Sequence, residues 1–133
     1  MQTEALQKMF PVGDLDHLLD EAEIPVLKTP QAQGDVFWYP VRDGQVSGLK
    51  PIPSQGLVIV EGLNGHPHTL FADGECLFAP NPQRGQRLGT AVIPEDSTLI
   101  VGHNEHGYSM VGSGTYVFNR SREQSDEIRI LAD

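Results

Sequence analysis

The chain has 133 residues, a formal net charge of −9 and a single cysteine. This length fits one domain with its own core, and a single cysteine excludes an internal disulfide and a cysteine-rich zinc site. Because nucleic-acid binding depends on Lys and Arg that neutralise phosphates, the nine basic residues argue against nucleic acid as a partner.

The first 30 residues are predicted to be helical. A short helix is expected from about Thr3 to Met9, and the leucines of "GDLDHLLDEAEIP" (13–25) recur at the i, i+3, i+4 spacing of an amphipathic helix, with Asp14 as its N-cap. We expect residues 1–30 to form a segment that closes one end of the domain or docks on a protein partner, including a second copy of the chain in a homo-oligomer.

The N-terminus lacks the basic start of a signal peptide, and no apolar stretch approaches the roughly 20 residues that span a bilayer. The sequence therefore predicts no membrane association and a cytoplasmic protein, or a virion-associated one if a phage encodes it. Cys76 lies among apolar residues and is expected to be a buried thiol.

From Gly34 onward, short β-branched or aromatic runs alternate with Gly, Pro, Asn and Asp, which is typical of antiparallel β-structure. The runs are 35–41, 56–62, 68–72, 76–80, 89–94, 97–103, 108–111, 114–120 and 127–132. We expect residues 31–133 to form a single, mainly β domain, either a barrel or a sandwich. The breaks "DG" (73–74) and "SG" (113–114) are predicted to be hairpin turns.

Two short stretches, "GHPHTL" (65–70) and "GHNEHG" (102–107), hold four of the five histidines. Alternate side chains of a strand point to the same face, so His66, His68 and Leu70 are expected to lie together. The same count places Leu99, Val101, His103 and Glu105 on one side. Each apolar row thus ends in polar residues, as at the mouth of a barrel.

Imidazole nitrogens bind Zn²⁺, Fe²⁺, Ni²⁺ and Cu²⁺ well, and a carboxylate can complete the ligand set. The sequence therefore predicts a metal site at His66, His68 and His103, with His106 or Glu105 as the fourth ligand. In a second interpretation Glu105 works with a histidine as acid and base in catalysis. In a third, these are ordinary turn histidines that satisfy backbone groups. The sequence leaves open whether the protein is an enzyme.

The ordered segments "QGDVFWYPV", "VEGLNGHPH", "HNEHG", "GTYVFNRSRE" and "ILAD" resemble a group of small uncharacterised bacterial and bacteriophage proteins over residues 33–133. The pattern is also similar to the cupin superfamily, whose small β-barrels hold a metal. That resemblance implies that His66 and His68 are the paired histidines, that Asp73 lies near the carboxylate position and that His103 supplies the last ligand.

Three functions follow from these patterns. The first is a metal-binding β-barrel that acts on a small molecule. The second is a phage-encoded structural or assembly protein that uses residues 1–30 and exposed strand edges to meet another chain. The third is a protein that captures a small anionic ligand at the barrel mouth with Arg84, Arg87 and the histidines.

Overall fold

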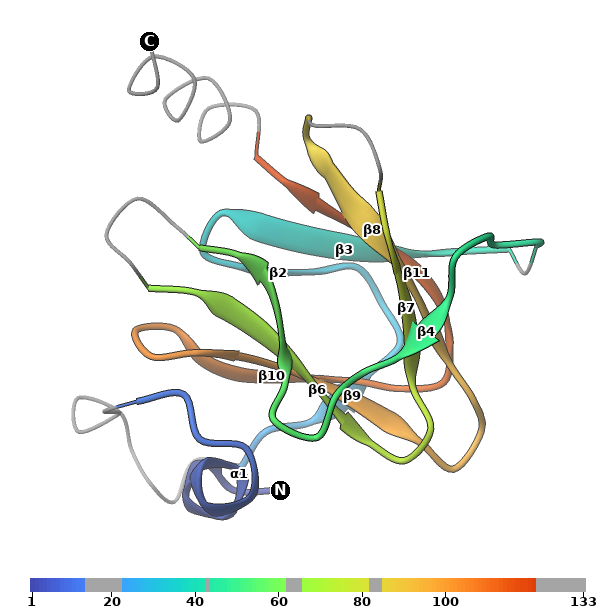
Figure 1. Cartoon of the computed structure of the whole chain (residues 1–133). Coiled ribbons are helices and arrows are strands. Elements are labelled where there is room, and N and C mark those ends of the chain that lie inside the picture. The colour runs from blue at the N-terminus through green and yellow to red at the C-terminus, as the bar shows by residue number, and fades with distance from the viewer. Residues whose placement is uncertain (14–22, 43, 62–65, 82–84, 122–133) are drawn as a thin grey trace, which may run out of the picture.

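Two β-sheets pack face to face, with one short helix outside them (Figure 1). The computed structural model describes residues 1–13, 23–42, 44–61, 66–81 and 85–121. The helix α1 spans Thr3–Met9. The five-stranded sheet has the order β1 (Val26–Leu27), β10 (Gly107–Val111), β9 (Thr98–His103), β6 (His68–Asp73), β5 (Leu57–Val60). The six-stranded sheet has the order β2 (Gln31–Gln33), β3 (Val36–Val41), β11 (Gly114–Arg120), β8 (Arg87–Ile93), β7 (Leu77–Pro80), β4 (Lys50–Pro51).

The predicted fold class is confirmed as a mainly β sandwich with a short N-terminal helix. All strand pairs are antiparallel except β1 with β10. Among the described strands no ladder joins the two sheets, so they form a sandwich and not a closed barrel. The helix expected around Leu15–Leu19 and the run 127–132 lie outside the described residues. The division of the chain at residue 30 stays a prediction.

The two predicted hairpin turns are wrong, because the chain crosses between the sheets at both. β6 and β10 belong to the five-stranded sheet, whereas β7 and β11, which follow them, belong to the six-stranded sheet. A Gly-containing turn allows a sharp reversal but does not determine which strand the next one pairs with. The tight hairpins lie instead at residues 34–35, between β2 and β3, and at 104–106, between β9 and β10.

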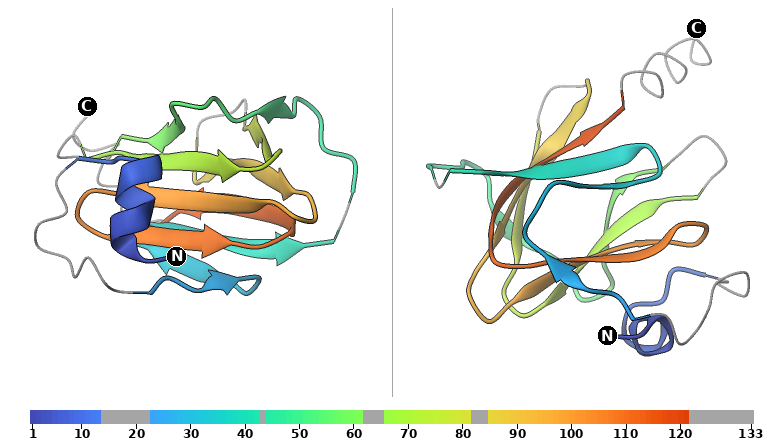
Figure 2. Two further views of the ribbon diagram at one scale, coloured as in Figure 1. Left: turned by 90° about the horizontal axis from the view of Figure 1, so that it is seen from below. Right: turned by 180° about the vertical axis from the view of Figure 1, so that it is seen from behind.

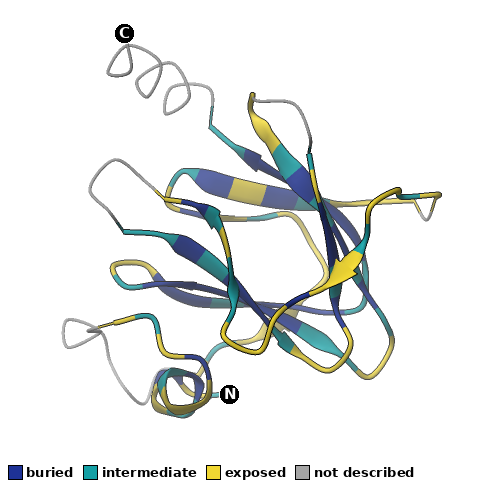
Figure 3. Cartoon of the chain, in the orientation of Figure 1, coloured by how far each residue is buried: buried dark blue, intermediate teal, exposed yellow. Residues whose placement is uncertain are grey.

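The main core lies between the sheets, where Trp38 of β3 stacks on Phe118 of β11 with ring centroids 5.1 Å apart. A second apolar cluster lies on the outer face of the five-stranded sheet, where α1 crosses the strands (Figure 2). There Leu6 and Phe10 pack near Phe71 and Ile100. The central strand β9 is therefore covered on both faces and is buried from Leu99 to His103 (Figure 3). Its continuous apolar run, Leu99–Val101, is typical of a strand buried on both faces.

The outer face of the six-stranded sheet has a different environment. Phe37 and Val41 of β3 are each 37 % exposed, and Phe37 stacks on Tyr39 with centroids 6.4 Å apart. No described element packs over these side chains as α1 does on the other sheet. No helix in the described part of the chain has the length and apolar character needed to cross a membrane.

Candidate functional site

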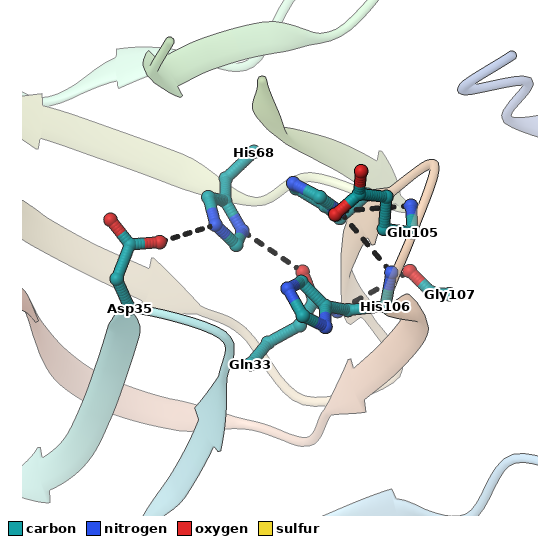
Figure 4. A network of polar contacts seen from close by, with 7 residues as sticks. Gln33, Asp35, His68, Glu105, His106 and Gly107 are labelled. Carbon is teal, nitrogen blue, oxygen red and sulfur yellow. Dashed lines mark hydrogen bonds and ion pairs between the residues drawn. The ribbon is translucent and has the colours of Figure 1, made fainter. Parts of the chain in front are cut away.

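Four histidines meet at one end of the sandwich, where the β2–β3 turn, the start of β6 and the β9–β10 turn come together. Figure 4 shows two of them, His68 and His106, with the polar residues around them. We call His66, His68, His103 and His106 the imidazole cluster. Its ring centroids lie 4.4 Å apart for His68 and His103, 4.6 Å for His103 and His106, and 6.2 Å for His66 and His103. The structure therefore brings the two histidine motifs together around His103.

Strand parity determines which of these rings are buried. His68 begins β6 and His103 ends β9, and their exposed fractions are only 1 % and 4 %. Leu70 and Val101, two residues away on the same strands, lie in the core between the sheets, as their spacing predicts. His66 precedes β6 and His106 lies in the β9–β10 turn, so both rings are at the rim of the cluster.

Both ring nitrogens of His68 have polar partners at the β2–β3 hairpin, one at the end of β2 and one in the turn. Nδ1 lies 3.1 Å from Gln33 Oε1, and Nε2 lies 3.0 Å from Asp35 Oδ1. Burial lowers the pKa of His68, while the hydrogen bond and charge of Asp35 oppose this shift and His106 adds to it. The second carboxylate oxygen, Asp35 Oδ2, is buried and has no hydrogen-bond partner among the described residues.

His103 holds the β9–β10 turn. Its Nδ1 accepts hydrogen bonds from the backbone N–H groups of Glu105 and His106, at 3.0 and 3.2 Å. Burial lowers the pKa of His103 to about 4, with further lowering from His68 and His106, while a hydrogen bond to the backbone of His66 and the charge of Glu105 oppose it. His103 is therefore a neutral ring at pH 7, with its Nδ1 lone pair occupied by the turn.

Gly34 brings the β2–β3 turn against the cluster. Its φ of +60° is a conformation that glycine adopts at little cost. A Cβ atom at this position would lie 2.7 Å from His106 Nε2, so the ring of His106 packs directly on the glycine backbone. The β2–β3 and β9–β10 turns thus contact each other here.

Glu105, the predicted catalytic carboxylate, lies at the exposed rim. Its Oε1 is 3.3 Å from His66 Nε2, and the two side chains are 53 % and 36 % exposed. Within the described ranges, no three His, Cys, Asp or Glu side chains are already arranged to hold one metal ion. The imidazole cluster therefore has a buried half, His68 and His103, and a solvent-facing half, His66 and His106. Glu105 lies beside the solvent-facing half.

Sequence reasoning missed Gln33 and Asp35. Both flank Gly34 in "QGD", and this polar tripeptide directly before an apolar strand was the available signal. Gln33 Nε2 donates to the carbonyl oxygens of Val101 and Gly107, so it ties the six-stranded sheet to the five-stranded one. Asp73, the carboxylate that the cupin resemblance implied, ends β6. It lies five residue steps along the strand from His68, a distance of about 16 Å, so Asp35 takes its place beside His68.

The arginines of the anionic-ligand hypothesis are only partly described. Arg87 begins β8, and its strand neighbour on β11 is Asn119, next to Arg120. Arg84 lies outside the described residues. Capture of an anion by these side chains stays a prediction.

Comparison with models of protein families gives a match over most of the β sandwich. A family model described as a domain of unknown function, DUF8820, matches residues 32–121. No curated protein and no solved structure matches the chain. The matched segment runs from β2 to the end of β11 and includes the whole imidazole cluster together with Gln33, Asp35 and Glu105. The chain therefore belongs to the DUF8820 family.

Proposed function

We propose that this DUF8820 domain binds a divalent transition metal ion at the imidazole cluster, with His68 and Asp35 as the buried ligands. The observation that carries the proposal is the 3.0 Å contact between His68 Nε2 and Asp35 Oδ1. Two adjacent ligand atoms with bonds of about 2.0–2.2 Å to one ion lie about 3 Å apart. A cation there would also neutralise a carboxylate whose second oxygen is buried without a partner.

The rim histidines are the natural source of further ligands. The rings of His66 and His106 are at the surface end of the cluster, and exposed side chains change rotamer at low cost. His103 Nδ1 is occupied by the turn, so this residue mainly holds His106 in place. A set of imidazoles with one carboxylate suits Zn²⁺, Fe²⁺, Ni²⁺ or Cu²⁺. This use of His-x-His with a later histidine is the cupin-like part of the proposal.

Glu105 keeps its predicted acid–base role within this proposal. Its carboxylate is at the exposed rim beside His66, where a small molecule that reaches the metal would pass. A bacterial or bacteriophage source and a cytoplasmic or virion location, as the sequence suggests, belong to the same proposal.

Metal titration of the full chain tests the proposal. After treatment with a chelator, the wild type should bind about one Zn²⁺ per chain in isothermal titration calorimetry, and bound metal should raise the melting temperature by mass action. Asp35→Asn removes the charged ligand but keeps a group that can hydrogen-bond to His68, and should weaken Zn²⁺ binding at least tenfold. Asp73→Asn, a carboxylate at the other end of β6, is the matched control and should bind as the wild type does.

Two outcomes would reject the metal site. One is a wild type that binds no stoichiometric Zn²⁺, Ni²⁺, Cu²⁺ or Fe²⁺ and whose melting temperature does not change with these ions. The other is equal metal affinity for Asp35→Asn and Asp73→Asn. Circular dichroism of both variants establishes that they are folded.

A role in assembly is the second candidate, and the outer face of the six-stranded sheet, which no described element covers, favours it. Phe37 and Val41 are exposed there. In contrast, Leu6 of α1 is fully buried against the five-stranded sheet of the same chain. We therefore propose that a second copy of the chain would meet this face and not the apolar side of α1. Light scattering should give a dimer mass for the wild type and a monomer mass for Phe37→Lys. A wild-type monomer at high concentration would contradict the assembly role.

A further inference from the structure

We infer that Gln33 is a positioning residue that holds the hydrogen of His68 on Nδ1 and thereby turns the Nε2 atom toward Asp35 and a bound metal ion. The role toward the metal rests on the proposed function above. The placement of the hydrogen is argued and tested separately, because it depends on the polar partners of Gln33 and His68 and not on a metal ion.

The orientation of the Gln33 amide is determined by two backbone carbonyl groups. Gln33 Nε2 lies 3.0 Å from the oxygen of Val101 and 3.3 Å from the oxygen of Gly107, with Ser109 Oγ also at 3.3 Å. Carbonyl oxygens only accept hydrogen bonds. A reversed amide would place Oε1 against both oxygens with no hydrogen between them, and Gln33 is only 5 % exposed, so this arrangement would be costly.

The amide orientation then determines the state of His68 Nδ1. Gln33 Oε1 faces this nitrogen at 3.1 Å, and an amide oxygen has no hydrogen to donate. The contact is a hydrogen bond only when Nδ1 carries the hydrogen, and without it two buried acceptors would face each other. Both side chains are buried, so bulk water does not replace the contact.

Asp35 competes with Gln33 for the same hydrogen. Its Oδ1 lies 3.0 Å from Nε2, and a carboxylate is a stronger acceptor than an amide oxygen. The Asp35 side chain is 21 % exposed and can accept from water instead, whereas the buried Gln33 Oε1 has no such alternative, so the hydrogen of a neutral ring stays on Nδ1. Without Gln33 the hydrogen of a neutral ring would move to Nε2 and occupy the atom proposed to bind metal. Histidines that bind metal commonly donate their other N–H to a carbonyl or carboxylate, and loss of that partner weakens metal affinity about 10–100-fold.

The experiment uses the full chain with ¹⁵N-labelled histidine and long-range ¹H–¹⁵N correlation spectra, which separate a nitrogen that carries hydrogen from one with a lone pair. At pH 8 the wild type should show hydrogen on Nδ1 of His68. Gln33→Met keeps the size of the side chain but has no acceptor, and should lose the hydrogen from Nδ1 and bind Zn²⁺ at least tenfold more weakly. Ser109→Ala removes only one of the partners of Gln33 Nε2 and should retain the wild-type pattern.

Each outcome decides one of the two claims. A wild type without hydrogen on Nδ1, or Gln33→Met with hydrogen still there, overturns the inference. If Gln33→Met does not fold, the wild-type and Ser109→Ala spectra decide the placement of the hydrogen. A third outcome separates the two claims: Nδ1 carries hydrogen in the wild type and loses it in Gln33→Met, but the protein binds no metal. This result supports the role of Gln33 and refutes only the proposed function.

Discussion

Replacement of His103 with asparagine is expected to reduce the acid sensitivity of folding while the β9–β10 turn is kept. His103 Nδ1 accepts hydrogen bonds from the N–H groups of Glu105 and His106, two and three residues along the chain. An asparagine Oδ1 accepts the same bonds in an Asx turn. Asparagine takes up no proton, so the variant loses the titration of this site together with the ring contact to His68.

The magnitude follows from the pKa of His103, which burial lowers from 6.5 to about 4. A histidine with a lowered folded-state pKa stabilises the fold above pH 6.5, and this stabilisation is lost as the pH falls toward 4. For these two pKa values, the free energy of unfolding falls by about 0.8 kcal/mol at pH 6 and about 2 kcal/mol at pH 5. Below pH 4 the total loss approaches about 3 kcal/mol.

Urea denaturation at pH 7.5, 6 and 5 measures this difference. Between pH 7.5 and 5, the wild type should lose about 2 kcal/mol more unfolding free energy than His103→Asn does. His66→Asn, which removes a ring at the exposed rim, is the control and should follow the wild-type pH dependence. If His103→Asn is less stable than the wild type by the same amount at every pH, this constant difference reflects the lost ring contact with His68. Equal pH dependence of the wild type and His103→Asn would refute the assignment of acid sensitivity to this buried ring.

Three further predictions concern the core. Burial raises the pKa of the Cys76 thiol to about 11, so iodoacetamide at pH 8 should label it only in urea; rapid labelling of the folded protein would contradict this. Leu6 of α1 is fully buried against the five-stranded sheet, and Leu6→Ala should lower the unfolding free energy in urea by about 3 kcal/mol. A loss below about 1 kcal/mol would mean that the helix does not pack on the sheet. Gly89→Ala would place a Cβ against the Phe78 ring and 2.5 Å from the Ala79 carbonyl oxygen, which should cost about 3 kcal/mol. A wild-type melting temperature for this variant would disprove the close packing.

Local sequence patterns determined the strands and the faces of the site. The apolar runs at 68–72 and 97–103 form β6 and β9. Because alternate side chains of a strand share a face, His68 lies on the same face as Leu70, and His103 on the same face as Val101. These features depend on residues a few positions apart, because alternation and turn chemistry are local properties of the backbone. The sequence therefore determined which histidines could share a site.

The tertiary structure alone decided how the strands pair and which groups contact the histidine nitrogens. The turns at 73–74 and 113–114 cross between sheets because pairing depends on burial of whole sheet faces, which a turn sequence does not encode. Gln33 reaches Val101 across 68 positions of chain, and Asp35 reaches His68 across 33. Such contacts exist only once both sheets are assembled, and they turned two histidine motifs into one network with Gln33 and Asp35 at its buried end.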